Sequence, residues 1–158
     1  MNQFVPYGDS ALIIRLGDDI SPETNAAVRT LYHRIQKENI EGVVALLPSY
    51  NELMVQYDPF SVNLQALMNN VRLLQSKTDD LNMPESSLIV IPVVYGGKNG
   101  PDLHLVAEHN NLTVEEVIRI HSSTDYLVYM LGFTPGFCYL GGMDQRIAAP
   151  RKKNRYPC

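Results

Sequence analysis

The sequence Tyr129-Met-Leu-Gly-Phe-Thr-Pro-Gly-Phe-Cys-Tyr-Leu-Gly-Gly142 holds four of the ten glycines of the chain and four aromatic residues. The apolar run from Tyr126 to Leu131 predicts a buried strand, by its length and its β-branched and aromatic content. Thr134-Pro-Gly-Phe137 is typical of a type II turn, because Pro135 presets φ at the second position and Gly136 accepts the positive φ at the third. Two interpretations stay open: a packed corner of a β-barrel, or a loop that binds a ligand or partner through its aromatic rings.

The first half of the chain predicts the order strand, helix, strand, strand, helix. The expected elements are a strand in Phe4–Leu16, a helix from Ser21 to Asn39, strands at Gly42–Leu47 and Leu53–Tyr57, and a helix at about Asn63–Gln75. Serine followed by proline is a typical helix start, and asparagine is a typical helix end. This order favours a small α+β sandwich of ferredoxin-like type with both helices on one face of an antiparallel sheet.

The polar stretch from Lys77 to Ser87 is rich in structure breakers and predicts a boundary between a domain at residues 1–80 and another at 81–158. After it we expect a strand at Leu88–Val94, a glycine-rich loop containing Lys98, and two short helices. The helices are expected at Asp102–His109 and Val114–His121, the second opened by a capping box of Thr113 and Glu116. The loop around Lys98 lacks the spacing of a phosphate-binding loop and is interpreted as a plain turn.

Ala107, Asn111 and Val117 fall where a helix-turn-helix motif needs a small, a turn and a core residue. Against DNA binding, the second helix begins with Glu115 and Glu116, which would repel phosphates. DNA binding is therefore the weakest alternative.

The composition and charge of the chain argue against several classes of function. The chain has 158 residues and a net charge of −4, and four of its thirteen basic residues lie between Arg151 and Arg155. The acidic remainder argues against binding of nucleic acid or an anionic membrane. No apolar run suggests a membrane span or a secretory signal, so a cytoplasmic location is the expectation. Cys138 and Cys158 have no metal-ligand spacing and are expected to be reduced thiols.

The sequence lacks the common catalytic motifs of zinc proteases, serine hydrolases and dinucleotide-binding enzymes. Of the four histidines, only His121 lies close in sequence to the glycine-rich stretch Tyr129–Gly142. It is a candidate for proton transfer or substrate binding, and the alternative is a helix-ending residue that interacts with the helix dipole. A thiol–imidazole pair of His121 with Cys138 is a further, weaker hypothesis.

Residues 121–142, followed by Ala149-Pro-Arg151, closely resemble the signature of a family whose members are variously called the B subunit of 5-oxoprolinase, allophanate hydrolase subunit 1 and kinase A inhibitor KipI. Further matches, in the family's order, lie at Tyr7–Leu12, Ile91–Gly97, Gly100–Leu103 and Thr113–Ile118. The resemblance implies a ferredoxin-like amino-terminal domain followed by a cyclophilin-like β-barrel.

The resemblance also implies a function. The chain would act with subunits A and C of an ATP-dependent 5-oxoprolinase, which opens the lactam of 5-oxo-L-proline to L-glutamate. ATP belongs to the complex, and no metal is implied. The alternatives are allophanate hydrolase subunit 1 and a regulatory protein that binds and inhibits a histidine kinase. By position in the motif, the candidate catalytic residues are His121 and Arg151, and the candidate substrate or interface loop contains Tyr129, Gly132, Phe133, Pro135, Gly136, Phe137 and Tyr139.

Relatives continue beyond the region of Pro150-Arg151 through a further glycine-rich, barrel-forming stretch that is not seen here. We therefore expect the barrel to be incomplete, because the chain is truncated or because a partner completes it, and we expect the second half to be less stable than the first.

Overall fold

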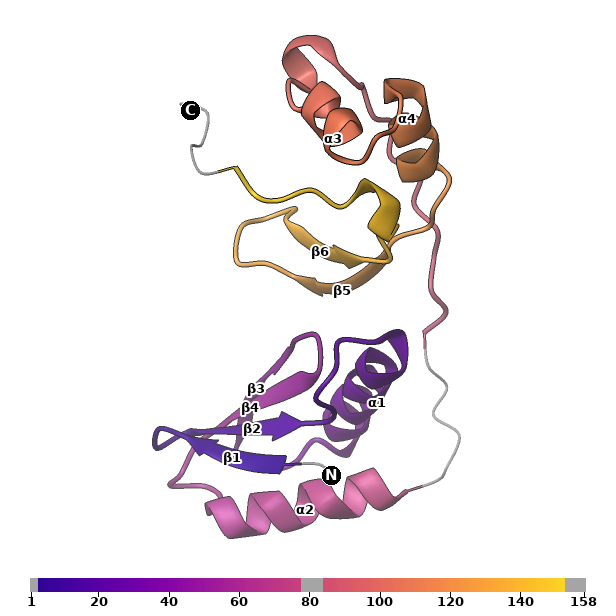
Figure 1. Ribbon diagram of the computed structural model, residues 1–158. Coiled ribbons are helices and arrows are strands. Elements are labelled where there is room, and N and C mark those ends of the chain that lie inside the picture. The colour runs from indigo at the N-terminus through magenta and orange to yellow at the C-terminus, as the bar shows by residue number, and fades with distance from the viewer. Residues whose placement is uncertain (1–2, 78–83, 153–158) are drawn as a thin grey trace. The chain divides into compact units, whose positions relative to one another are not determined.

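The computed structural model describes residues 3–77 and 84–152 (Figure 1). They form two units. The first unit combines residues 1–86 with residues 129–139, and the second combines residues 87–128 with residues 140–158. Part of the predicted domain boundary, residues 78–83, lies outside the described residues.

The first unit contains a four-stranded antiparallel sheet. Its strands are β1 (Gln3–Tyr7), β2 (Ala11–Arg15), β3 (Val43–Pro48) and β4 (Glu52–Tyr57), in the order β1-β2-β4-β3. The prediction of one strand across Phe4–Leu16 is wrong, because a turn divides that stretch into β1 and β2. Gly8 lies in this turn with φ of 61°, a conformation that glycine adopts without steric cost.

Two helices pack against this sheet, and the start and end signals predicted for the first are confirmed. Helix α1 (Pro22–Glu38) begins after Ser21, whose side chain accepts a hydrogen bond from the backbone N–H of Thr24, and ends at Asn39 in the left-handed conformation. Helix α2 (Leu64–Ser76) is capped in the same way by the side chain of Asn63.

Both helices share one hydrophobic core with one face of the sheet. Alternate residues of β2 and β4 point to that face. The buried members of the core are Leu12, Ile14, Val28, Leu31, Ile35, Leu53, Val55, Tyr57, Leu67, Val71 and Leu74. Each large aliphatic side chain that is fully removed from water contributes about 1.5–3 kcal/mol, so this core is the main source of stability in the first unit.

The second unit has a much smaller core. Helices α3 (Leu103–His109) and α4 (Val114–Ser122) meet a short helix η2 (Gln145–Ile147), and their buried residues are Ala107, Val117, Ile120 and Ile147. The predicted capping box of Thr113 and Glu116 is confirmed.

Strands β5 (Leu127–Leu131) and β6 (Cys138–Gly141) form a two-stranded hairpin. The strand predicted in Tyr126–Leu131 is therefore present, but the prediction that it is buried is wrong, because Leu127, Val128 and Leu131 are exposed. By contrast, the predicted strand at Leu88–Val94 is wrong for this structure: among the described residues no strand pairs with it, and its aliphatic side chains are exposed. A strand exists only where a neighbour satisfies its backbone groups, which a sequence run by itself does not guarantee. The cyclophilin-like barrel stays a prediction, since a mixed α+β chain with antiparallel sheets is what the described residues form.

Candidate functional site

The loop between β5 and β6 is built by two backbone hydrogen bonds. The N–H of Phe137 donates to the carbonyl of Thr134 at 3.0 Å, and the N–H of Gly132 donates to the carbonyl of Phe137 at 2.7 Å. Gly136 has φ of 78°. These are the hydrogen bond and the positive φ that a type II turn requires, so the turn predicted at Thr134–Phe137 is confirmed.

Aromatic rings of this loop lie against its backbone and also face outward. The rings of Phe137 and Tyr139 meet edge to face with centroids 5.2 Å apart, over Gly132. Phe133 is fully exposed, and Pro135 and Gly136 are exposed with it. An exposed phenylalanine at the tip of a fixed turn presents a large apolar contact surface.

Within the first unit, two residues that no sequence motif singled out contact the hairpin. Tyr50 places its ring 5.5 Å from that of Tyr129 and 5.7 Å from that of Tyr139. Asn25, 2% exposed, donates hydrogen bonds to the carbonyls of Ser49, Tyr50 and Tyr129. The signal for Asn25 was present: it lies one helical turn before Val28 on the apolar face of α1, where a polar side chain needs a specific partner.

His121 lies in the second unit between two tyrosines. The hydroxyl of Tyr95 is 2.6 Å from Nδ1 of His121, and the ring of Tyr95 meets the imidazole edge to face at 5.7 Å. The ring of Tyr126 lies 5.4 Å from the imidazole, and its hydroxyl donates to the backbone carbonyl of His121 at 3.0 Å. Three separate segments therefore meet at this imidazole. Neither tyrosine was among the predicted site residues, because no local pattern predicts that they meet near the end of α4.

An ion pair of Arg146 and Asp144 acts electrostatically on this cluster through Tyr126. Arg146 donates from its guanidinium and backbone to Asp144, with a shortest distance of 2.6 Å, and these hydrogen bonds lower the pKa of Asp144 to about 2. Burial raises the pKa of Tyr126, and Tyr95 and Asp144 add to the rise. Tyr126 is therefore a neutral phenol at physiological pH.

The second candidate catalytic residue, Arg151, belongs to the same unit as His121. Arg151 is exposed, and no hydrogen bond or ion pair is described between it and His121 in residues 84–152. The neighbouring Lys152 forms an ion pair with Asp102. The thiol of Cys138 is exposed and is directed to the carbonyl of Gly136, so its pairing with His121 stays a prediction.

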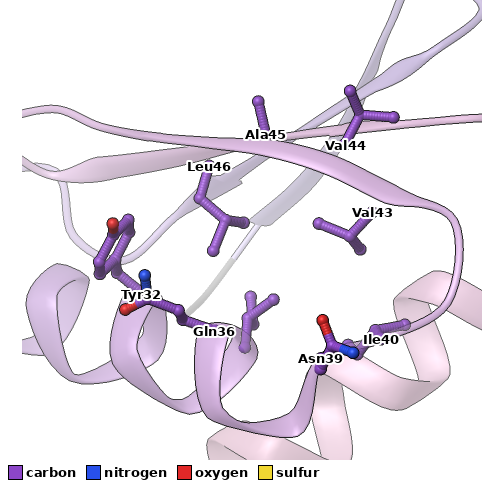
Figure 2. A pocket seen from close by; sticks show the side chains of 9 residues that line it. Tyr32, Gln36, Asn39, Ile40, Val43, Val44, Ala45 and Leu46 are labelled. Atoms are coloured by element: carbon purple, nitrogen blue, oxygen red, sulfur yellow. The ribbon is translucent and has the colours of Figure 1, made fainter.

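The described residues hold no cluster of three metal-ligating side chains. The helices that the structure describes are all too short or too polar to cross a bilayer. A shallow hollow of about 230 Å³ lies in the first unit, between the end of α1 and strand β3 (Figure 2). Its lining is mainly aliphatic and includes none of the predicted site residues, so it is not assigned to the site.

The fold and the glycine-rich aromatic hairpin define a class. The chain belongs to the family of the carboxyltransferase domain, subdomain C and D, and the sequence pattern of that family matches residues 2–156.

Individual proteins are similar to this chain in sequence along more than nine tenths of its length. The chain is 38% identical to the B subunit of 5-oxoprolinase from Bacillus subtilis (strain 168), covering 98% of this chain and 69% of that protein. It is 34% identical to the B subunit of 5-oxoprolinase from Escherichia coli O157:H7, covering 92% and 65%. The crystal structure of TTHA0988 in space group P212121 matches with a TM-score of 0.74 and 32% identity, covering 91% of this chain and 28% of that one. The chain thus spans about two thirds of the length of these curated relatives.

Proposed function

We propose that the chain is the B component of an ATP-dependent 5-oxoprolinase, which opens 5-oxo-L-proline to L-glutamate together with subunits A and C. The observation that carries the proposal is the 38% identity to a 5-oxoprolinase B subunit along 98% of the chain. The alternatives, a histidine-kinase inhibitor and allophanate hydrolase subunit 1, are not favoured, because the curated relatives that match bear the 5-oxoprolinase name.

Two domains are part of this proposal. Residues 1–80 would form a ferredoxin-like domain, and the strand order β1-β2-β4-β3 supports this. In a ferredoxin-like sheet the closing strand follows the second helix. Here β1, which pairs with β2, would take that strand's place at the edge of the sheet. Residues 81–158 would form the first part of a cyclophilin-like barrel.

The proposed roles divide between the two parts of the site. His121 and Arg151 would contact the reacting amide, since imidazole and guanidinium both stabilise anionic oxygen. The loop containing Tyr129, Gly132, Phe133, Pro135, Gly136, Phe137 and Tyr139 would form a substrate cleft or the interface with the C subunit, supported by the exposed rings of Phe133 and Phe137.

ATP does not fit the glycine-rich loop around Lys98. The N–H groups of Asn99 and Gly100 both donate to the carbonyl of Gly96, so they are not free to surround a phosphate. We therefore place the ATP site on another component of the complex.

The test of the proposed function is 5-oxoproline-dependent ATP hydrolysis by subunits A and C of a matching system, with and without this chain. Turnover that requires the chain is the expected result. Turnover of equal rate without it would contradict the proposal.

The interface role of the loop has its own test. Replacing the half-exposed Phe137 by alanine is expected to weaken association with the C subunit by tenfold or more, as loss of an aromatic anchor costs about 2 kcal/mol. Titration calorimetry measures the affinity, and Phe60→Ala, which removes a 99% exposed ring outside the loop, is the matched control. Unchanged affinity with a lower unfolding midpoint would instead assign Phe137 a structural role.

A further inference from the structure

We propose that Tyr95 is a positioning residue that holds His121 in the neutral tautomer with its proton on Nε2, so that His121 acts as a hydrogen-bond donor to a substrate oxygen and not as a general base. The catalytic half of this inference rests on the proposed function, whereas the tautomer is a property of the chain alone.

The direction of the hydrogen bond between Tyr95 and His121 decides the tautomer. The two atoms, the hydroxyl oxygen of Tyr95 and Nδ1 of His121, are 2.6 Å apart, a short separation for two neutral groups. A phenol is a good donor and a weak acceptor, because its oxygen shares a lone pair with the ring. The unprotonated nitrogen of a neutral imidazole is a good acceptor. The stronger arrangement has the hydroxyl donating to Nδ1, which leaves the proton on Nε2.

The imidazole is held in orientation as well as in tautomer. The hydroxyl of Tyr126 donates to the backbone carbonyl of His121, near the C-terminal end of α4, where the last carbonyls lack a partner within the helix. The rings of Tyr95 and Tyr126 both contact the imidazole, one edge to face and one tilted. The ring thus has two aromatic contacts, and the backbone carbonyl of the same residue is hydrogen-bonded.

Nε2 remains available for a ligand. It has no hydrogen-bond partner among the described residues, and the His121 residue is partly exposed. An N–H whose direction is fixed by a second residue, and which a ligand can reach, stabilises a developing negative charge without a rearrangement of the side chain.

The chemistry of lactam opening needs such a donor. The oxygen of water bonds to the carbonyl carbon, the ring carbon–nitrogen bond breaks, and the proton released by the water ends on the nitrogen. Negative charge develops on the carbonyl oxygen between these events. A donor at Nε2 stabilises that charge and loses no proton. The γ-phosphoryl group of ATP passes to a second water in a separate step of the complex, which gives ADP and phosphate.

The tautomer is tested directly by long-range 1H–15N NMR spectra of the full chain with labelled histidine, at about pH 8.5, above the ordinary titration range of the side chain. The chain has four histidines, His33, His104, His109 and His121, and the signals lost in His121→Gln identify the last. We expect the Nε2–H pattern in the wild-type chain and a mixture of tautomers in Tyr95→Phe. Unchanged signals from the other three histidines show that the fold is retained. An Nδ1–H pattern in the wild type, or no change in Tyr95→Phe, would overturn the positioning role.

The role of His121 is tested in the reconstituted complex. Glutamine carries an amide N–H close to the position of Nε2, so a donor role predicts that His121→Gln retains a substantial part of the turnover that His121→Ala loses. The loss in His121→Ala is expected to be about 10²–10³-fold in kcat, as for removal of one donor to an oxyanion. Equal loss in both variants would show a proton-transfer role and overturn the donor assignment.

The same turnover assay measures the contribution of Tyr95. Tyr95→Phe is expected to lower kcat severalfold with KM nearly unchanged, and Tyr7→Phe, a similar change on the exposed side of β1, is the matched control. Failure of the proposed function is distinguishable from failure of this inference. Without chain-dependent turnover in the wild type, the NMR result still decides whether Tyr95 fixes the tautomer.

Discussion

Gly132 lies where the aromatic rings of the hairpin approach its own backbone. A Cβ atom at this position would lie 2.9 Å from Cδ1 of Phe137 and 3.2 Å from Cε2 of Tyr139. The first distance is shorter than a Cβ atom tolerates and the second is tight, so the rings would have to shift; both rings belong to the loop that the candidate site needs. At this residue the requirement for glycine is therefore steric.

Gly132→Ala is expected to destabilise the hairpin by about 1–3 kcal/mol, the usual cost of forcing extra volume into a packed contact. Hydrogen exchange of the Gly132 amide, which donates to Phe137, measures the local opening. The matched variant is Gly136→Asn, since Gly136 has positive φ and open space around its Cβ position. Asparagine tolerates this conformation better than other residues do, so Gly136→Asn should lose less. A larger loss in Gly136→Asn would contradict the steric explanation.

Asp144 makes a different kind of contribution, through its charge. Its folded pKa, about 2, lies below the ordinary value of 3.8 because Arg146 donates to the carboxylate. The stabilisation is present above the ordinary pKa and is lost as the pH falls towards the folded pKa. Urea unfolding between pH 5 and pH 2 should therefore show a steeper loss of stability in the wild type than in Asp144→Asn. Parallel curves would show that the pair does not contribute, as is common for exposed ion pairs.

At the scale of elements, local signals predicted local structure. The caps Ser21, Asn39 and Asn63 act within one helical turn, so the sequence near them contains all that their function requires. Leu88–Val94 has an equally clear strand pattern, but a strand depends on a partner elsewhere in the chain. The same limit applies to the site: His121 is identified from its motif, whereas its contact with Tyr95, 26 residues away, depends on how separate segments meet.

Asn25 connects elements that no pattern relates. Its side chain donates to the carbonyls of Ser49 and Tyr50, in the turn between β3 and β4, and to that of Tyr129. Asn25→Ala should lower the free energy of unfolding by about 1–3 kcal/mol, because buried carbonyls lose their donor. Urea denaturation measures this loss. Asn69→Ala, on the exposed face of α2, should change stability by less than about 0.5 kcal/mol. Equal effects would show that the buried contacts of Asn25 carry no special weight.

At the scale of the whole molecule, the two units differ in how much apolar surface they bury. In residues 3–77 and 84–152, the core of the first unit contains eleven buried residues and that of the second contains four. Stability follows buried apolar area, and small cores are marginal. A less stable second half stays a prediction, and the difference in core size among the described residues supports it.

Limited proteolysis is expected to cleave first in the exposed segment between residues 84 and 94 and in the second unit, and to leave a resistant fragment from residues 1 to about 80. Mass spectrometry of the early fragments identifies the cleavage sites. The physical reason is that cleavage follows local opening, which costs least where few apolar contacts must break. Equal protection of both halves would contradict the difference in core size.

The exposed segment Leu88–Val94 also bears on how the chain behaves at high concentration. Its sequence, Leu-Ile-Val-Ile-Pro-Val-Val, has no charge and is dominated by β-branched residues. A segment of six or seven such residues with an open backbone is the kind that stacks into cross-β fibrils. Pro92 interrupts it, because proline lacks the N–H that a stacked strand needs. Pro92 therefore divides the segment into two apolar runs, each shorter than the six or seven residues that cross-β stacking needs.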